Sequence, residues 1–167
     1  MFQINDVIIY GAQGVCRIAA MEEKNISGVK KEFFVLKPIN DATATVFVPT
    51  DKEAALKKMR RILTESQIRG LLDAAAAERT TWIAQDNARK ERYRQLLAGG
   101  DQLALICMIK SIYEHKKQCD EKGKRLHMID EHFLKEAEQM LFNEFQYVLK
   151  LNTKEELRQR ILAGTEA

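Results

Sequence analysis

The sequence predicts an α+β protein with two domains: a small β-rich domain over residues 1–60 and an all-α domain over residues 61–167. Short runs of β-branched and aromatic residues, separated by turn residues, fill the first fifty positions, and both prolines of the chain, Pro38 and Pro49, also lie there. Beyond Pro49 the apolar residues recur with the spacing of helices. A chain of 167 residues is long enough for one ordinary domain or two small ones.

Four short strands are expected in the β-rich domain, over residues 7–10, 15–18, 32–36 and 44–48. Turn residues separate them, at positions 11–14, 25–28 and 38–41. Four or five short strands in so little chain favour a strongly bent antiparallel sheet or a small open barrel. Such a module leaves strand edges exposed, and an exposed edge favours a partner or a cover.

Helix caps mark the second domain. We expect Thr50 and Asp51 to cap a helix that runs through Met59. Thr64 with Gln67 has the form of a capping box for the next helix, and residues 153–156 have the same form. Gly99 and Gly100 are expected to end one helix, with Asp101 capping another. Apolar residues at spacings of three and four predict a long amphipathic helix through positions 134, 137, 141, 145 and 148.

The composition excludes several classes of protein. Apolar residues make up 46% and charged residues 31% of the chain, which is unlike a disordered or a membrane-spanning chain. No stretch approaches eighteen apolar residues, and the first residues lack the pattern of a signal peptide. The three cysteines show no CxxC spacing, so neither a disulfide framework nor a zinc site is indicated. We therefore expect a soluble, cytoplasmic protein without membrane contact.

The charge is unevenly distributed, although the net charge is only +3. Residues 79–94 carry five basic and two acidic side chains, a balance of +3, whereas residues 130–167 carry five basic and eight acidic ones, a balance of −3. This distribution indicates a localised basic patch in the middle of the chain.

Candidate chemistry other than binding is weak. Gly11 and Gly14 follow a strand but precede no helix, so a hairpin turn is a better interpretation than a phosphate-binding loop. His115 and Cys119 are four residues apart, but no third ligand is evident, and a metal site needs three or four. His127 and His132 are interpreted as surface residues. We expect no catalytic residues, no metal and no cofactor, and hence a protein that is not an enzyme.

Trp82 is the one tryptophan, and it stands outside any apolar stripe, with Arg79 before it and basic residues from Arg89 to Arg94 after it. Thr80 or Thr81 could cap a helix at this point. An exposed aromatic ring beside clustered cations suits DNA, since the cations contact phosphates and the ring wedges against a base. The alternative is a half-buried tryptophan that packs at a helix junction beside a solvated basic face.

The sequence resembles the CarD/CdnL-like bacterial transcription regulators over nearly its whole length and in the same order. The resemblance rests on residues 6–10, Gly14-Val15, residues 28–37, residues 45–49, Trp82, Gly100-Asp101 and residues 134–149. It implies a Tudor-like N-terminal module that docks on the β subunit of RNA polymerase. It also implies a helical DNA-binding domain whose tryptophan wedges into the minor groove of promoter DNA at the upstream edge of the transcription bubble, which would stabilise the open complex.

The resemblance also assigns binding residues. On the polymerase side these are Lys24, Thr45 and Phe47; on the DNA side they are Trp82, Arg79, Arg89, Lys90, Arg92 and Arg94. Two departures stand out: residues 83–88 separate Trp82 from the cations, and Phe47 replaces a basic residue of some relatives. The expected partners are RNA polymerase and promoter DNA, with no small-molecule substrate. An adaptor that binds polymerase without wedging DNA is the alternative.

Overall fold

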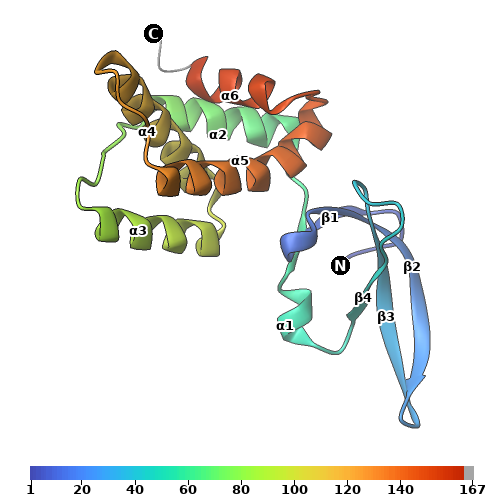
Figure 1. Cartoon of the computed structure of the whole chain (residues 1–167). Coiled ribbons are helices and arrows are strands. Elements are labelled where there is room, and N and C mark those ends of the chain that lie inside the picture. Colours follow the sequence, from blue (N-terminus) through green and yellow to red (C-terminus); the bar gives the residue numbers. More distant parts are fainter. Residues whose placement is uncertain (164–167) are drawn as a thin grey trace. The chain divides into compact units, whose positions relative to one another are not determined.

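The computed structural model describes residues 1–163 and confirms the α+β fold class. An open, antiparallel five-stranded sheet comes first and a set of helices follows (Figure 1). The chain divides into two compact units, one of residues 1–63 and one that starts at Thr64. The division lies three residues beyond the expected one at residue 60, and Arg61, which was assigned to the helical domain, belongs to the sheet.

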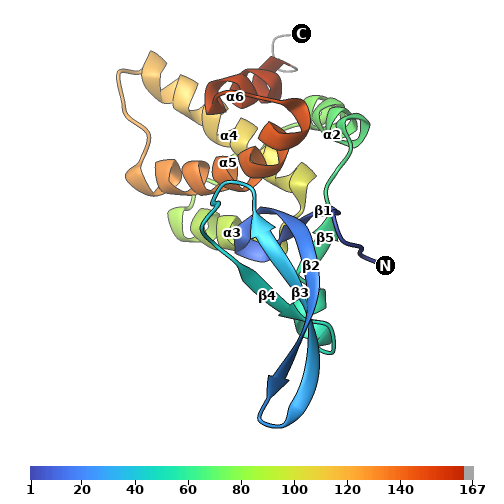
Figure 2. The ribbon, with the colours of Figure 1, turned by 90° about the vertical axis from the view of Figure 1, so that its right-hand side faces the viewer.

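The N-terminal unit is a sheet with the strand order β4-β3-β2-β1-β5. Its strands are β1 (Val7–Tyr10), β2 (Val15–Ile26), β3 (Val29–Pro38), β4 (Val46–Pro49) and β5 (Met59–Arg61). β2 and β3 are longer than expected, because Ser27 and Gly28 both adopt positive φ and form a two-residue turn that lets the ladder run to its end. The long β2–β3 hairpin extends past the other strands (Figure 2).

The helix expected through Met59 is wrong. Only one short turn, α1 (Glu53–Leu56), forms, and residues 59–61 then pair with β1 as β5. Met59 is only 5% exposed and packs in the core of the sheet, so its burial favours a strand here over a longer helix. The pairing also covers the edge of β1, which otherwise would lie open to another chain.

One face of the sheet forms the core of this unit. Its fully buried side chains come from four strands: Ile8, Cys16, Ile18, Leu36 and Val48. Ile8 stands opposite Cys16 in the β1–β2 ladder, and Ile18 stands opposite Leu36 in the β2–β3 ladder. These cross-strand pairs place apolar side chains on the same face and thereby set the register.

The C-terminal unit contains α2 (Glu65–Ala77), α3 (Asp86–Gly99), α4 (Gln102–Glu121), α5 (Met128–Leu149) and α6 (Lys154–Leu162). Three of the expected caps form: Thr64 and Gln67 make a full capping box, and Asp101 and Thr153 accept hydrogen bonds from the first turns of α4 and α6. The box expected at residues 153–156 is incomplete, because Glu156 accepts from the backbone N–H of Asn152. Gly100 ends α3 in the left-handed conformation. None of the helices within residues 1–163 has the length and apolar character to cross a membrane.

Candidate nucleic-acid and protein interfaces

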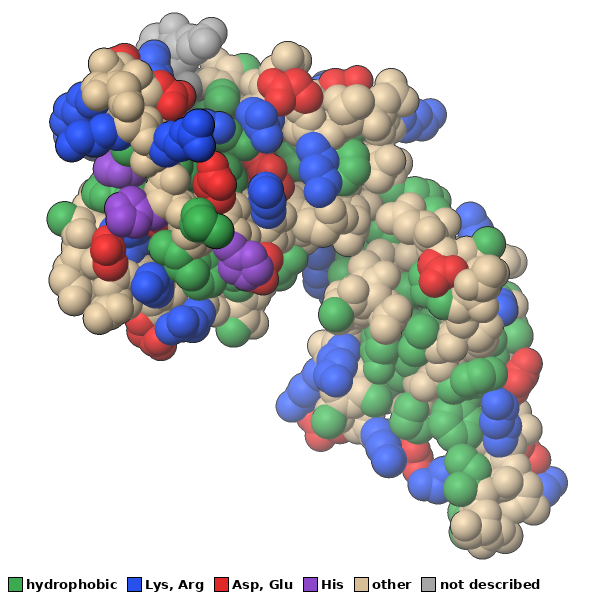
Figure 3. Space-filling model, in the orientation of Figure 1, with side chains coloured by type: hydrophobic (Ala, Val, Ile, Leu, Met, Phe, Trp, Pro, Cys, Tyr) green, Lys and Arg blue, Asp and Glu red, His purple; other side chains and the backbone are tan. Residues whose placement is uncertain are grey.

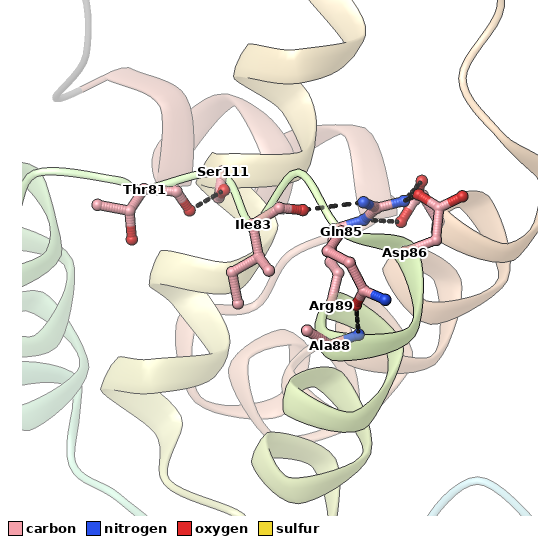
Figure 4. Close-up of polar contacts among 8 residues, drawn as sticks. Thr81, Ile83, Gln85, Asp86, Ala88, Arg89 and Ser111 are labelled. Carbon is pink, nitrogen blue, oxygen red and sulfur yellow. Dashed lines mark hydrogen bonds and ion pairs between the residues drawn. The ribbon is translucent and has the colours of Figure 1, made fainter.

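An extended segment, residues 79–85, connects α2 to α3 and carries Trp82. The prediction that Thr80 or Thr81 caps a helix is wrong: α3 starts at Asp86, and Gln85 caps it by accepting a hydrogen bond from the backbone of Ala88 (Figure 4). Thr80 instead donates its hydroxyl to Glu114 of α4. The segment is extended because its polar groups find partners on neighbouring helices rather than within a turn of its own.

Hydrogen bonds fix both ends of this segment. Ser111 on α4 donates to the carbonyl of Thr81 at 3.0 Å, and Arg89 on α3 donates to the carbonyl of Ile83 at 2.9 Å (Figure 4). The buried ammonium of Lys110 donates to the carbonyl of Ala75 at 2.5 Å and so ties the end of α2 to α4. Trp82 lies between the two anchored carbonyls, and its backbone is thereby held in place.

The Trp82 ring is half-buried and covered by two side chains. The imidazole of His115 lies parallel to it, with the ring centroids 3.6 Å apart and the planes 4° apart. The guanidinium carbon of Arg89 lies over the indole, 4.4 Å from its centroid. A parallel imidazole at this distance occupies one face of the indole and leaves no room there for the guanidinium. His115 and Arg89 therefore cover opposite faces of the indole. Neither face of the indole is free to stack on a base in this arrangement.

Arg89, one of the cations expected on the DNA side, is buried. Its Nε and Nη2 donate to the two carboxylate oxygens of Asp130 at 2.9 and 3.0 Å, and Nη2 also donates to Asp86 at 2.9 Å. Burial acts to lower the pKa of Arg89, but the hydrogen bonds to Asp130 and Asp86 outweigh it and raise the pKa. The side chain stays charged and paired with two carboxylates, and it lies against Trp82.

The other predicted cations lie in two places. Arg79 and Arg92 are exposed at the mouth of one cleft between residues 79–83, α3 and α4. Arg94 lines a separate hollow between α3 and α5 and forms a loose surface ion pair with Glu91 at 3.7 Å. Lys90 is half-buried on α3. The basic run is therefore no single patch, because successive residues of a helix point in different directions.

A second basic cluster was missed from the sequence. Residues 116–125, at the end of α4 and in the α4–α5 connection, carry five basic and two acidic side chains, again a balance of +3 but over ten residues. Its cations are Lys116, Lys117, Lys122, Lys124 and Arg125. Figure 3 shows Lys and Arg side chains gathered over this end of α4, near the histidines. The charge count alone could have identified it.

This second cluster lies close to Trp82. His115, which stacks on the indole, directly precedes Lys116 and Lys117 in α4. Burial lowers the pKa of His115 below its usual 6.5, and the charges of Arg89, His127 and Lys122 act in the same direction, against Asp130. The side chain that supports Trp82 is thus within the field of the α4–α5 cations.

In the N-terminal unit, the sheet brings Lys24 and Phe47 together, although they lie on different strands. The Lys24 ammonium is 3.4 Å from the centroid of the Phe47 ring, which also meets Phe33 edge-on at a centroid distance of 6.5 Å. Phe47 is 40% exposed and lies on β4, an edge strand. Thr45 is exposed two residues earlier and accepts a hydrogen bond from Lys37. These residues form a cation–aromatic surface that is accessible to a partner.

The described residues show no other chemical centre. Within residues 1–163, no group of three or more His, Cys, Asp or Glu side chains is placed to hold a metal ion. Burial raises the pKa of Cys16 to about 11, so this thiol is a core side chain and not a nucleophile at neutral pH.

The comparisons with known proteins concern the N-terminal unit. Residues 2–63 match the family model of the CarD-like/TRCF RID domain, where RID denotes the RNA-polymerase-interacting domain. The match ends at residue 63, where the first compact unit also ends. No curated protein matches the chain.

Proposed function

Residues 2–63 make this chain a CarD-like, RNA-polymerase-interacting family member, and from that premise we propose that it is a transcription regulator that acts without catalysing a reaction. In this proposal, the sheet docks on the β subunit of RNA polymerase and the helical unit contacts promoter DNA at the upstream edge of the bubble. Trp82 then wedges into the minor groove and stabilises the open complex. The family match of the sheet is the observation that carries the proposal.

The cation–aromatic surface supports docking. Phe47 lies on the edge strand β4, and the ammonium of Lys24, a residue of β2, lies over its ring, so that an apolar ring and a positive charge are side by side. An edge strand has unpaired backbone groups that a strand of a partner can join. We therefore assign the polymerase contact to the β4 edge, with Lys24, Thr45 and Phe47 setting its specificity.

The setting of Trp82 supports a wedge that enters edge first. His115 and Arg89 cover its two faces and hold its plane, so an inserted indole needs no reorganisation on contact. Phosphates on either side would meet Arg79 and Arg92 on one flank and the α4–α5 cations on the other. Wedging unstacks a base step at a cost of a few kcal/mol, which tethering to polymerase helps to offset through a raised local concentration.

The covered faces of Trp82 also favour the second candidate, an adaptor that binds polymerase without wedging DNA. In that case the stack of His115, Trp82 and Arg89 is a packed helix junction, and the basic residues are only solvated. The two candidates share the docking surface and differ in whether Trp82 affects DNA.

The proposal is tested by the dissociation rate of promoter complexes formed with cognate RNA polymerase. We expect the chain to lengthen the lifetime of the open complex, and Phe47→Ala to require a higher protein concentration for the same lifetime. Lys30→Ala, which removes an exposed ammonium elsewhere on the hairpin, is the matched control and should act like wild type. A lifetime that does not respond to saturating wild-type protein would refute the regulator.

A further inference from the structure

A cleft of about 200 Å³ opens in the helical unit, beside the segment that carries Trp82. Its walls come from residues 79–81 and Ile83, from α3 and from α4. The polymerase contact does not use it, because it lies in the other unit. Nor does the edge-first wedge, because the indole does not line it.

The cleft has a lining of both apolar and polar side chains, and two of its lining residues are exposed arginines. Buried Tyr93 and Met108 line its inner wall, where they are 5% and 4% exposed. Arg79 and Arg92 lie exposed at the mouth, and neither makes an ion pair within residues 1–163. A slot with an apolar wall, hydroxyl groups and two guanidinium groups without ion pairs in that part of the chain matches a planar group that has both apolar faces and polar edges and carries phosphate on its flanks. A nucleotide has this chemistry.

The size of the cleft selects one nucleotide rather than several. Sites for drug-sized ligands have volumes of about 300–1,000 Å³, and this cleft is smaller. Proteins that bind single-stranded nucleic acid place bases against apolar or aromatic side chains one at a time and hold the backbone with cations. The occupant that fits is a single base with its adjoining phosphates.

The cleft and the tryptophan share a wall. Ala104, Met108 and Ser111 line the cleft at helical spacings of four and three along α4, and His115, which supports Trp82, follows four residues later on the same face. Arg89 lines the cleft and also lies over the indole. A DNA strand that meets the edge of Trp82 therefore passes the mouth of the cleft.

We propose that this cleft binds one unpaired nucleotide of the DNA strand displaced next to Trp82, with the base between Tyr93 and Met108 and its phosphates on Arg79 and Arg92. The inference rests on the proposed function, since it needs Trp82 at the edge of opened DNA. It gives the base that the wedge displaces a defined place, so that its capture opposes re-annealing. Unpaired bases are the least costly to capture because no pairing must be broken.

The experiment measures binding of the full chain to forked DNA at low salt. Forks carry an intact single-stranded arm or an abasic nucleotide at one of the first three unpaired positions. We expect the abasic nucleotide at one position to weaken binding by about tenfold and at the other positions to have little effect. Equal binding at all three positions would overturn the inference.

Ala104→Phe fills the cleft, since Ala104 lines it and only its backbone forms the cap hydrogen bond with Asp101. This variant should bind the intact fork as weakly as wild type binds the abasic one. Ala98→Phe, at an exposed position of α3 outside the cleft, is the matched control and should keep the preference. Arg92→Gln, compared with Arg69→Gln at an exposed position of α2, gives a second pair of variants that does not depend on tolerance of a larger side chain.

Two further outcomes separate this inference from the proposed function. If wild type binds intact and abasic forks equally and Trp82→Ala weakens both, the cleft assignment fails and the wedge stands. If wild type binds no fork, or Trp82→Ala has no effect on any fork, the DNA contact of the proposed function fails as well. Competition by deoxyadenosine monophosphate at concentrations similar to those of the fork would assign the cleft to free nucleotides and overturn the assignment to a DNA strand.

Discussion

Among the cation–aromatic contacts of the molecule, the Lys24–Phe47 pair of the sheet and the Arg89–Trp82 pair of the helical unit differ most usefully. In the sheet, the Lys24 ammonium lies 3.4 Å from the Phe47 centroid, and Phe47 remains 40% exposed. In the helical unit, the Arg89 guanidinium lies 4.4 Å from the Trp82 centroid, and Arg89 is only 3% exposed. The first pair is open to a partner, whereas the second is enclosed by carboxylates.

The difference teaches that burial and pairing decide what a cation does. An exposed lysine that contacts a ring can exchange that contact for contacts with a partner, because an exposed cation–π contact contributes little free energy. A buried arginine with two carboxylate partners cannot leave without exposing uncompensated charge. Arg89 therefore holds an aromatic ring in place, while Lys24 helps to form a docking surface.

The largest expected effect comes from breaking the enclosed pair. Asp130→Ala leaves the Arg89 guanidinium buried without its bidentate partner, so we expect a loss of about 3–5 kcal/mol in the free energy of unfolding. Urea unfolding of the full chain measures it. Glu136→Ala, which breaks the exposed pair with His132, is the control and should cost no more than about 1 kcal/mol. An equal loss in the free energy of unfolding for Asp130→Ala and Glu136→Ala would contradict the buried pairing of Arg89 with Asp130.

Replacing both partners sharpens the same point. Because an apolar pair of similar volume can substitute for a buried ion pair, Arg89→Met with Asp130→Leu should recover most of the stability that Asp130→Ala loses. The double variant should nonetheless uncover one face of Trp82. Acrylamide quenching of the only tryptophan is the readout, and it should rise relative to wild type. Quenching at the wild-type level would mean that Arg89 does not cover the indole.

Substitutions in the exposed Lys24–Phe47 pair should affect the binding of RNA polymerase more than the stability of the fold. Lys24→Ala and Phe47→Ala should each weaken binding to cognate RNA polymerase by about tenfold, in the range of an interface hot spot. Both should change the free energy of unfolding by only about 0.5–1 kcal/mol, the value of an exposed cation–π contact. Lys30→Ala should leave both quantities near wild type. If neither Lys24→Ala nor Phe47→Ala changes the affinity for RNA polymerase, the docking surface lies elsewhere on the sheet.

The smallest expected effect concerns the pH at which His115 is protonated. The pKa of His115 is lowered, so the unfolded chain takes up its proton at a higher pH than the folded chain does. Between the lowered value and the usual 6.5 the unfolded state binds more protons, and the contribution of His115 to stability is therefore lost as the pH falls through this window. Fluorescence of Trp82 reports the titration, since a protonated imidazole quenches a stacked indole.

The variant Arg89→Met should move this midpoint upward, because one of the charges that lower the pKa of His115 is gone. His115→Gln should abolish the transition. A midpoint at or above 6.5 in wild type would contradict the burial of the imidazole against Trp82.

Much of the fold could be predicted from local sequence patterns. The capping box at Thr64, the cap at Thr153 and the Gly100-Asp101 break identify helix ends because their hydrogen bonds lie within a few residues. The fate of residues 51–61 was not predictable in this way. Met59 becomes part of a strand because β1, nearly fifty residues earlier, offers an edge and a core position.

The candidate site shows the same limit. The sequence identified Trp82 as the unusual residue, and the family resemblance assigned Lys24 and Phe47 separately to the polymerase side; the structure brings these two into contact. It did not reveal that Arg89 is buried, because Asp130, its main partner, lies 41 residues away on another helix. The role of Arg89 depends on a tertiary contact, whereas the missed basic cluster at residues 116–125 could have been found by counting charged residues in the sequence.

The most direct test compares wild type with Trp82→Ala in two measurements on the same preparations, the affinity for cognate RNA polymerase and the lifetime of the open promoter complex. Because docking is assigned to the sheet and DNA contact to Trp82, the variant should bind polymerase as wild type does and should fail to lengthen the lifetime. An equal lengthening by both proteins would contradict the wedge and leave the adaptor as the function.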